Sequence, residues 1–334
     1  MNIVVRCAAA LCALSALAMP AQAQQFTMKI SSPTINDVTQ QWAKEFAAGL
    51  KARVGDKIKV EFYPASQLGQ IPATVEGVAM GTIEAVAPAS GFFIGLEPRF
   101  QVFDAPGLFK DMAHAQRVLA DPQVRARLAT FASAKGMEMI AAWPHGPINL
   151  VSHKAVRKIG DFQGQKIRVP GAAPLQVKPF EALGAQPVSM PLGEVLSAMQ
   201  NRTIDGLIAA AAVFTAFKYY DVAKAMTPLP QSFLVVPAMA NKAWLKSLGP
   251  ELEKAVREEA LAAQRKVETF AIDDVARTAG VWKSHGGEVI TLPEADVKAY
   301  LAKVETIAPA VLNANPATKG DFELMSAKAK ALSQ

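Results

Sequence analysis

An arginine at the end of a short apolar run is the residue of this chain with the clearest chemical use. Ile167 and Val169 flank Arg168, and Pro170 stops the run, so the guanidinium lies where a predicted strand meets a loop. A second short strand is predicted to end at Asp205-Gly206. In an open α/β sheet, the ends of neighbouring strands form the crevice where ligands bind. The planar fork of an arginine matches a carboxylate, so the sequence predicts a carboxylate site at Arg168.

The segments around Arg168 alternate between strand and helix patterns, which is typical of a mainly parallel sheet covered by helices. An apolar residue at every fourth position from Val38 to Leu50 predicts a helix after the first strand. Strands are predicted at 26–30, 58–62, 83–87, 137–141, 149–152, 166–169, 203–208 and 233–240.

The length of the chain predicts two lobes, because single cores rarely grow beyond about 250–300 residues. We expect residues 24–146 with 233–250 in lobe I, and residues 147–232 with 280–334 in lobe II. Residues 251–279 continue a helical pattern without proline or glycine, and a helix of about 28 residues spans about 42 Å, which is enough to bridge both lobes. The tail is expected to add a strand and two helices, with Pro316 between the helices.

Several short motifs occur in the order that is typical of one family, and the chain therefore resembles that family. It is the DctP-like family of periplasmic solute-binding proteins, which serve tripartite ATP-independent periplasmic (TRAP) transporters. The resemblance covers essentially the whole chain after the leader. The motifs are KISS at 29–32, IKVEFYP at 58–64, QLG at 67–69, MGTIE at 80–84, APGLF at 105–109, KIRVP at 166–170 and IDG at 204–206.

This resemblance implies a two-lobed periplasmic binding protein fold of type II-like topology, with a long helix bridging the lobes. It also implies that Arg168 clamps the carboxylate of a small organic acid in the cleft between the lobes. The partners would then be that acid and the membrane permease subunits of a TRAP transporter, with the protein in the periplasm.

Several positions depart from the family pattern, and each departure is toward apolar residues. Where relatives that bind sugar acids have an asparagine, the resemblance places Ala209, and Gly171 stands where an asparagine is common. A second arginine of the family falls near Ile148 or Asn149. Unpaired polar groups cost about 1–3 kcal/mol each, so these changes disfavour a polyol or a second carboxylate.

The predicted pocket therefore holds a monocarboxylate with an apolar body, such as benzoylformate or 4-methyl-2-oxopentanoate. Phe92 and Leu192 match pocket positions of the family, and Trp143 lies at the predicted crossing between the lobes. Ser90 and Asn149 remain as neutral donors for a 2-oxo or 2-hydroxy group. A C4-dicarboxylate or a sugar acid is the alternative ligand, and it would need a second cation or more polar partners.

The first residues predict a secretory signal peptide at 1–23. Arg6 precedes an apolar run that is too short for a membrane span, and Ala21-Gln22-Ala23 is a typical cleavage site. Both cysteines of the chain, Cys7 and Cys12, lie inside this leader, so the mature protein is expected to contain no disulfide. We expect a periplasmic protein that is not embedded in the membrane.

Other functional classes find little support. The four histidines have no metal-ligand spacing, and there is no phosphate-binding loop or nucleophile elbow, so neither a cofactor nor a metal is predicted. The formal charge of +6 comes from scattered lysines rather than a basic run with aromatic residues, so no nucleic-acid partner is expected. A periplasmic hydrolase or lyase and a sensory subunit remain as alternatives to a transport protein.

Overall fold

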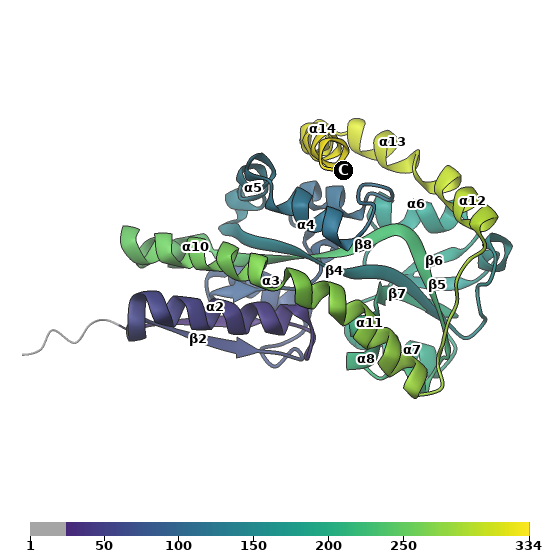
Figure 1. Ribbon diagram of the computed structural model, residues 1–334, viewed down its shortest axis with the longest axis horizontal. Helices are drawn as coiled ribbons and strands as arrows, with labels where there is room; N and C mark the ends of the chain where they lie inside the picture. Colours follow the sequence, from purple (N-terminus) through teal and green to yellow (C-terminus); the bar gives the residue numbers. More distant parts are fainter. Residues whose placement is uncertain (1–24, 334) are drawn as a thin grey trace, which may run out of the picture.

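The computed structural model describes residues 25–333, which form a single nine-stranded sheet with helices on both sides (Figure 1). The strand order is β2-β1-β3-β8-β4-β7-β5-β6, and β9 pairs with β8 beside this path. The predicted signal peptide at 1–23 lies outside the described residues. The strands are β1 (Phe26–Ser31), β2 (Ile58–Tyr63), β3 (Ala85–Val86), β4 (Met137–Ser152), β5 (Lys166–Val169), β6 (Gln186–Ser189), β7 (Gly206–Ala210), β8 (Ala225–Asn241) and β9 (Glu288–Val289).

Two long antiparallel strands, β4 and β8, run through the middle of the sheet and belong to both of its halves. On one side β1 pairs in parallel with β2 and β3, and on the other side β5 pairs in parallel with β6 and β7. The sequence predicted two shorter strands within 137–152 and one at 233–240, so the continuity of β4 and β8 was not predicted. Pro144 and Pro147 interrupt the pattern, because proline has no amide to donate, and β4 absorbs them at register shifts.

Helices cover both faces of the sheet and link the strands. They are α2 (Val38–Val54), α3 (Ile71–Met80), α4 (Met112–Ala120), α5 (Pro122–Leu128), α6 (Pro174–Ala182), α7 (Leu192–Gln200), α8 (Ala211–Ala216), α9 (Lys242–Ser247), α10 (Pro250–Lys266), α11 (Glu268–Ser284), α12 (Glu294–Val304), α13 (Ile307–Asn313) and α14 (Pro316–Ala331). The 3₁₀ turns η3 (Ser90–Phe93) and η4 (Pro98–Asp104) follow β3.

The predicted bridging helix is present as two helices, α10 and α11, which meet at Val267. Together they run from beside α2 to beside α8 (Figure 1). The Gln116 side-chain amide donates to the carbonyl of Glu268 at 2.8 Å, and a side-chain donor within the helical ladder is a known cause of a kink. The expectation of one uninterrupted helix at 251–279 was therefore wrong in this detail.

The tail contains β9 and three helices rather than the two that were expected, because α12 and α13 are separate. The last helix, α14, begins at Pro316 and packs against α4, α5 and η4. Asp321 of α14 forms ion pairs with Arg99 and Arg127. The division into lobes remains a prediction, but α14 contacts elements in the range assigned to lobe I, although the tail was assigned to lobe II.

A close approach of β7 to β4 gives a test of this sheet register. A Cβ atom at Gly206 would lie 2.7 Å from the carbonyl oxygen of Val151 and 2.9 Å from the Cβ of Ser152. We expect Gly206→Ala to lower the free energy of unfolding by about 1–3 kcal/mol, as overpacking does. Gly160→Ala is the matched control, because nothing lies within 4 Å of a Cβ there. Equal stability of the two variants in urea titrations would contradict the register.

Candidate ligand-binding site

Arg168 is a buried cation that has no acidic partner among residues 25–333. It lies on β5, where it pairs with Leu207 of β7 and Val188 of β6, and its side chain is 2% exposed. Its Nε donates to the carbonyl oxygen of Met190 at 2.9 Å, while its NH2 group is buried with no hydrogen-bond partner in residues 25–333. Burial lowers the pKa of Arg168 to about 10, which still leaves the guanidinium charged at neutral pH. The guanidinium is therefore fixed through Nε, and its terminal NH2 group can donate to a further acceptor.

The space around Arg168 is a small pocket with walls from both halves of the sheet. We call it the Arg168 pocket, and it encloses about 470 Å³ including its open mouth. Apart from Arg168, the polar side chains in its wall are those of Thr34, Thr39 and His145. The other lining residues are Pro33, Ala87, Pro88, Ala89, Phe92, Pro170, Leu192, Ile208, Ala209, Val213, Leu234 and Val236.

His145 and Asp37 form a buried pair in this wall that the sequence did not reveal. His145 Nε2 lies 2.9 Å from Asp37 Oδ2, and both side chains are at most 2% exposed. Burial alone would raise the pKa of Asp37, but hydrogen bonds from His145, Thr34 and the Gln40 amide, with the charge of His145, outweigh burial and lower this pKa. The carboxylate is therefore an acceptor, and Nε2 carries the hydrogen.

This pairing leaves the other ring nitrogen of His145 without a hydrogen-bond partner in residues 25–333, in a pocket that Arg168 also lines. Nδ1 of His145 is buried with no partner in the described residues, and the same is true of Thr39 Oγ1. His145 is the unpaired residue of a β-bulge, since Pro144 pairs with Val235 and Gly146 with Leu234. Bulges often orient a side chain beside a site. The pocket thus combines three unsatisfied polar groups with an apolar wall.

The structure brings together some of the predicted site residues and separates others. Arg168, Phe92, Leu192 and Ala209 all line the Arg168 pocket. Ser90 lies in the wall of a neighbouring hollow that also includes Ala209.

Gly171, Asn149 and Trp143 do not line the Arg168 pocket. A Cβ atom at Gly171 would lie 2.7 Å from Gln176 Oε1, so this glycine makes room for Gln176. Asn149 pairs with Ala209 in the sheet and donates to the carbonyl oxygen of Pro147 at 2.8 Å. Trp143 stacks on Trp42 with 4.8 Å between ring centroids and so belongs to the core, not to the cleft.

The neighbouring hollow, which we call the second hollow, is lined by η3, η4, α6, β8 and Tyr300 of α12. It contains one carboxyl group, that of Asp104, with Gln176 beside it. Burial raises the pKa of Asp104 to about 7, although the Gln176 amide counteracts part of this effect. The lining residues are Ala89, Ser90, Gly91, Phe103, Asp104, Ala105, Pro106, Ile148, Pro170, Leu175, Gln176, Pro179, Phe180, Ile208, Ala209, Leu229, Ser232, Phe233, Leu234 and Tyr300.

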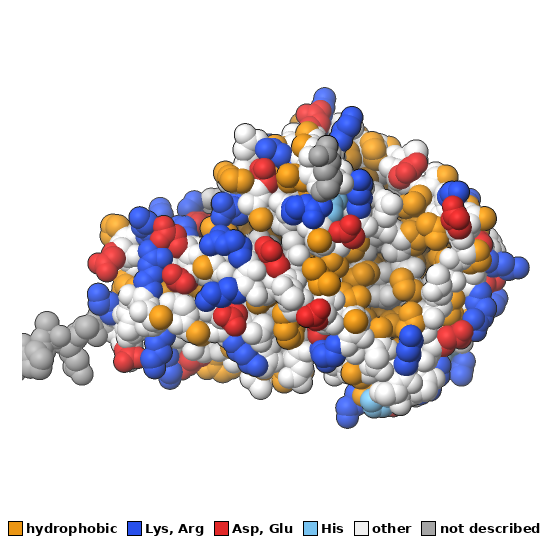
Figure 2. Space-filling view, in the orientation of Figure 1, with side chains coloured by type: hydrophobic (Ala, Val, Ile, Leu, Met, Phe, Trp, Pro, Cys, Tyr) orange, Lys and Arg blue, Asp and Glu red, His pale blue; other side chains and the backbone are white. Residues whose placement is uncertain are grey.

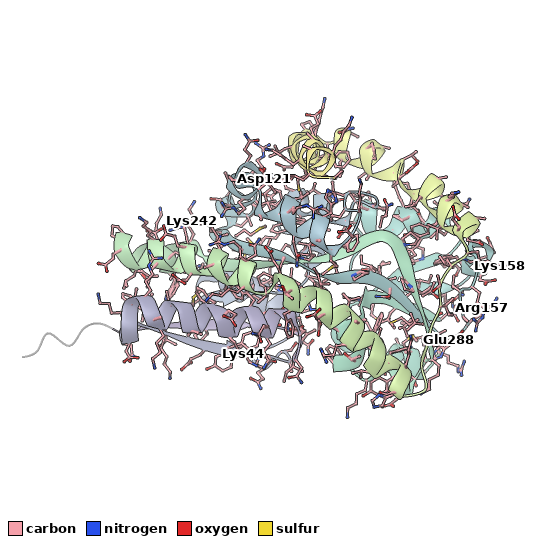
Figure 3. The ribbon with its side chains drawn as sticks, in the orientation of Figure 1. Lys44, Asp121, Arg157, Lys158, Lys242 and Glu288 are labelled. Carbon is pink, nitrogen blue, oxygen red and sulfur yellow. The ribbon has the colours of Figure 1, made fainter. Side chains whose placement is uncertain are left out.

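Surface charges contrast with Arg168 because many of them are paired and in contact with water. Arg157 and Glu288, which lie close together in Figure 3, join through two hydrogen bonds of 2.7 and 2.6 Å, and both side chains are more than half exposed. Such pairs contribute about 0–1 kcal/mol. On the face shown in Figure 2, Lys and Arg alternate with Asp and Glu. Arg168 differs from these pairs because it is buried and has no acidic partner in residues 25–333.

Two further features bear on function. In residues 25–333 no group of three or more His, Asp or Glu side chains is arranged to hold a metal ion. None of the helices in this same range is long and apolar enough to cross a membrane.

Comparison with known proteins gives consistent matches. The sequence profile of the DctP family, described as bacterial extracellular solute-binding protein, family 7, matches residues 31–314. The 2,3-diketo-L-gulonate-binding periplasmic protein YiaO of Escherichia coli is 30% identical over 293 residues, which is 87% of each chain. The C4-dicarboxylate-binding periplasmic protein DctP of Rhodobacter capsulatus is 28% identical over 250 residues, 73% of this chain and 74% of the relative.

A solved structure matches nearly the whole molecule. A TRAP periplasmic solute-binding protein from Desulfovibrio salexigens with bound orotic acid superposes with a TM-score of 0.86 at 26% identity, covering 92% of this chain and 100% of the other. This match confirms the predicted two-lobed α/β fold.

The raised pKa of Asp104 predicts a dependence of stability on pH. An unfolded aspartate ionises near pH 4, whereas folded Asp104 keeps its proton to about pH 7, so the folded state binds more protons between these values. The contribution of Asp104 to the free energy of unfolding should therefore fall as the pH rises from about 4 to about 7. Asp104→Asn does not titrate, so its melting temperature relative to the wild type should increase between pH 4.5 and pH 8. A difference that does not change with pH would contradict this assignment.

Proposed function

The chain belongs to the bacterial extracellular solute-binding proteins of family 7, and on that premise we propose that it captures a small monocarboxylate with an apolar body for a TRAP membrane permease. The acid binds in the Arg168 pocket. Relatives of the chain are named for binding small acids, among them 2,3-diketo-L-gulonate and C4-dicarboxylates. Membership of the family supports a small organic acid as the ligand, and the lining of the Arg168 pocket supports an apolar monocarboxylate among such acids.

The observation that carries the proposal is the unpaired buried charge of Arg168. A guanidinium that is taken out of water without a counter-ion raises the free energy of the folded protein, and a bound carboxylate removes this penalty. The terminal nitrogens of Arg168, Nη1 and the unpartnered Nη2, offer the two parallel donors that a carboxylate accepts.

Counting charges in the pocket favours one carboxylate rather than two. Arg168 contributes one positive charge, while any charge on His145 is balanced by Asp37 at 2.9 Å. A dicarboxylate would place its second negative charge against the Asp37 pair or against apolar side chains. This argument disfavours the C4-dicarboxylate alternative, because a desolvated carboxylate without a partner is costly.

The neutral polar groups suit an oxygen next to the carboxylate. His145 Nδ1 and Thr39 Oγ1 are the buried groups of the Arg168 pocket, besides Arg168, that lack partners in residues 25–333. A 2-oxo group accepts from Thr39 or from protonated His145, and a 2-hydroxy group also donates to neutral His145. A sugar acid carries more hydroxyl groups than these two side chains can satisfy. Phe92, Leu192 and Val213 then pack against the apolar body.

A hydrolase or lyase is the rival function, and the His145–Asp37 pair gives it only part of what it needs. A histidine that activates a nucleophile must be hydrogen-bonded to that nucleophile. His145 Nδ1 has no such partner in residues 25–333. The family members compared above are solute-binding proteins, which also favours binding without chemistry.

The direct test is to remove the guanidinium. Arg168→Ala should weaken binding of a monocarboxylate such as 4-methyl-2-oxopentanoate by at least about 100-fold in calorimetry, because the ligand charge loses its buried partner. Arg168→Lys should also bind poorly, since an ammonium cannot replace the planar fork. The melting temperature of Arg168→Ala without ligand should not fall, because the lost charge has no ion pair within the described range 25–333.

Arg157→Ala is the matched control, since it removes an exposed, paired arginine and should leave the affinity unchanged. The proposal would be refuted by an Arg168→Ala variant that keeps the affinity of the wild type. It would equally be refuted by a wild type that binds succinate or a sugar acid more tightly than any apolar monocarboxylate in a thermal-shift screen.

A further inference from the structure

The second hollow adjoins the Arg168 pocket through a common wall. Five residues line both spaces, and two of them are alanines whose side chains fill little of the boundary. These shared residues are Ala89, Pro170, Ile208, Ala209 and Leu234. A ligand whose head lies on Arg168 is therefore separated from the second hollow only by apolar side chains.

Apart from Ser90, the Asp104 carboxyl group and the Gln176 amide, the wall of the second hollow is suited to an uncharged, apolar group. None of its described lining residues is Lys, Arg or His, so it offers no cation to a second carboxylate. The hydroxyl of Ser232 already has partners in the carbonyl oxygen of Pro230, at 3.2 Å, and the hydroxyl of Tyr300, at 3.4 Å. Much of the remaining wall is apolar, with contributions from Phe103, Leu175, Phe180, Leu229 and Phe233.

Gln176 forms the rim of the second hollow where the two halves of the molecule meet. A Cβ atom at Gly91 would lie 2.2 Å from Gln176 Nε2, and one at Gly171 would lie 2.7 Å from Gln176 Oε1. The amide thus lies between η3, next to the first half of the sheet, and the segment after β5 in the second half. The two glycines leave the space that this side chain needs. The Gln176 side chain is buried and so contributes a contact with both halves to this wall of the hollow.

We propose that the second hollow is the second compartment of the ligand site and takes the hydrocarbon chain of an elongated monocarboxylate whose head is held by Arg168. This inference rests on the proposed function and narrows its ligand class from small apolar acids to acids with a chain. The continuity of the wall and the absence of a cation among the lining residues carry it. The hydrocarbon chain of the ligand passes Ala89 and Ala209 in the common wall and replaces water against the side chains of α6 and β8.

The experiment measures affinity against chain length in the wild type. The probes are the straight-chain 2-oxo acids from 2-oxobutanoate to 2-oxooctanoate, titrated by calorimetry. Each methylene buried in the second hollow should tighten binding roughly fourfold, which corresponds to the ~0.8 kcal/mol of a buried CH₂ group. The stoichiometry should stay at one acid per protein throughout the series.

A variant that fills the second hollow should cancel this gain. Ala105 lines the second hollow but not the Arg168 pocket, so Ala105→Leu should flatten the dependence on length while the affinity for 2-oxobutanoate stays within about twofold of the wild type. Ala302→Leu is the matched control, because this exposed alanine of α12 lies in neither wall and should leave the whole series unchanged.

The outcomes separate this inference from the proposed function. If short acids bind through Arg168 but longer ones bind no better in the wild type, the second compartment is refuted and the proposed function stands. Two acids bound per protein would also refute it, because the hollow would then hold a separate molecule. If no acid in the series binds, both the inference and the proposed function are overturned. If the affinity of Ala105→Leu still rises with the length of the acid, the hydrocarbon chain of the ligand does not bind in the second hollow, and the inference is refuted.

Discussion

The proposed function depends on a single buried charge, that of Arg168. Arg168 is held in the sheet by one hydrogen bond to the carbonyl of Met190, and its remaining donors have no acid within residues 25–333. Proteins avoid burying a charge in this way unless something pairs with it. The nearby His145–Asp37 pair balances its own charge, so the pocket as a whole has one positive charge to offer. This imbalance favours the anionic ligand that we propose, and the apolar wall around Arg168 favours a ligand with one carboxylate.

The position of that charge depends on the two strands that both halves of the molecule share. Since β4 and β8 run through the whole sheet, the short parallel strands on either side are fixed to the same pair. Arg168 approaches the pocket from β5 in the second half, whereas Phe92 approaches from η3 in the first. The bulge at His145 lies on β4 between them. A ligand in this pocket would thus contact both halves, and α10 and α11 both pack against β4.

Patterns that are local in sequence predicted much of this arrangement. Arg168 could be placed because a strand and a proline surround it, and the family motifs brought Phe92, Leu192 and Ala209 to the same pocket. The residues that the sequence did not reveal depend on distant contacts. His145 and Asp37 are 108 positions apart, and no local sequence pattern at either residue indicates that they pair. Trp143 was expected in the cleft, but its stacking on Trp42 of α2 places it in the core. Gln116 of α4, which donates to the carbonyl of Glu268 where α10 and α11 meet, is likewise far away in sequence.

The most direct test of whether the charge of Arg168 selects the ligand compares a carboxylate with a neutral group of the same shape. Binding of 4-methyl-2-oxopentanoate and of its primary amide to the wild-type protein can be measured by calorimetry in one buffer. The amide fills the same volume but brings no negative charge to Arg168. We expect the acid to bind at least about 100-fold more tightly than the amide, since a broken buried charge pair costs about 3–5 kcal/mol. Equal affinities for the acid and the amide would show that the charge of Arg168 does not select the ligand.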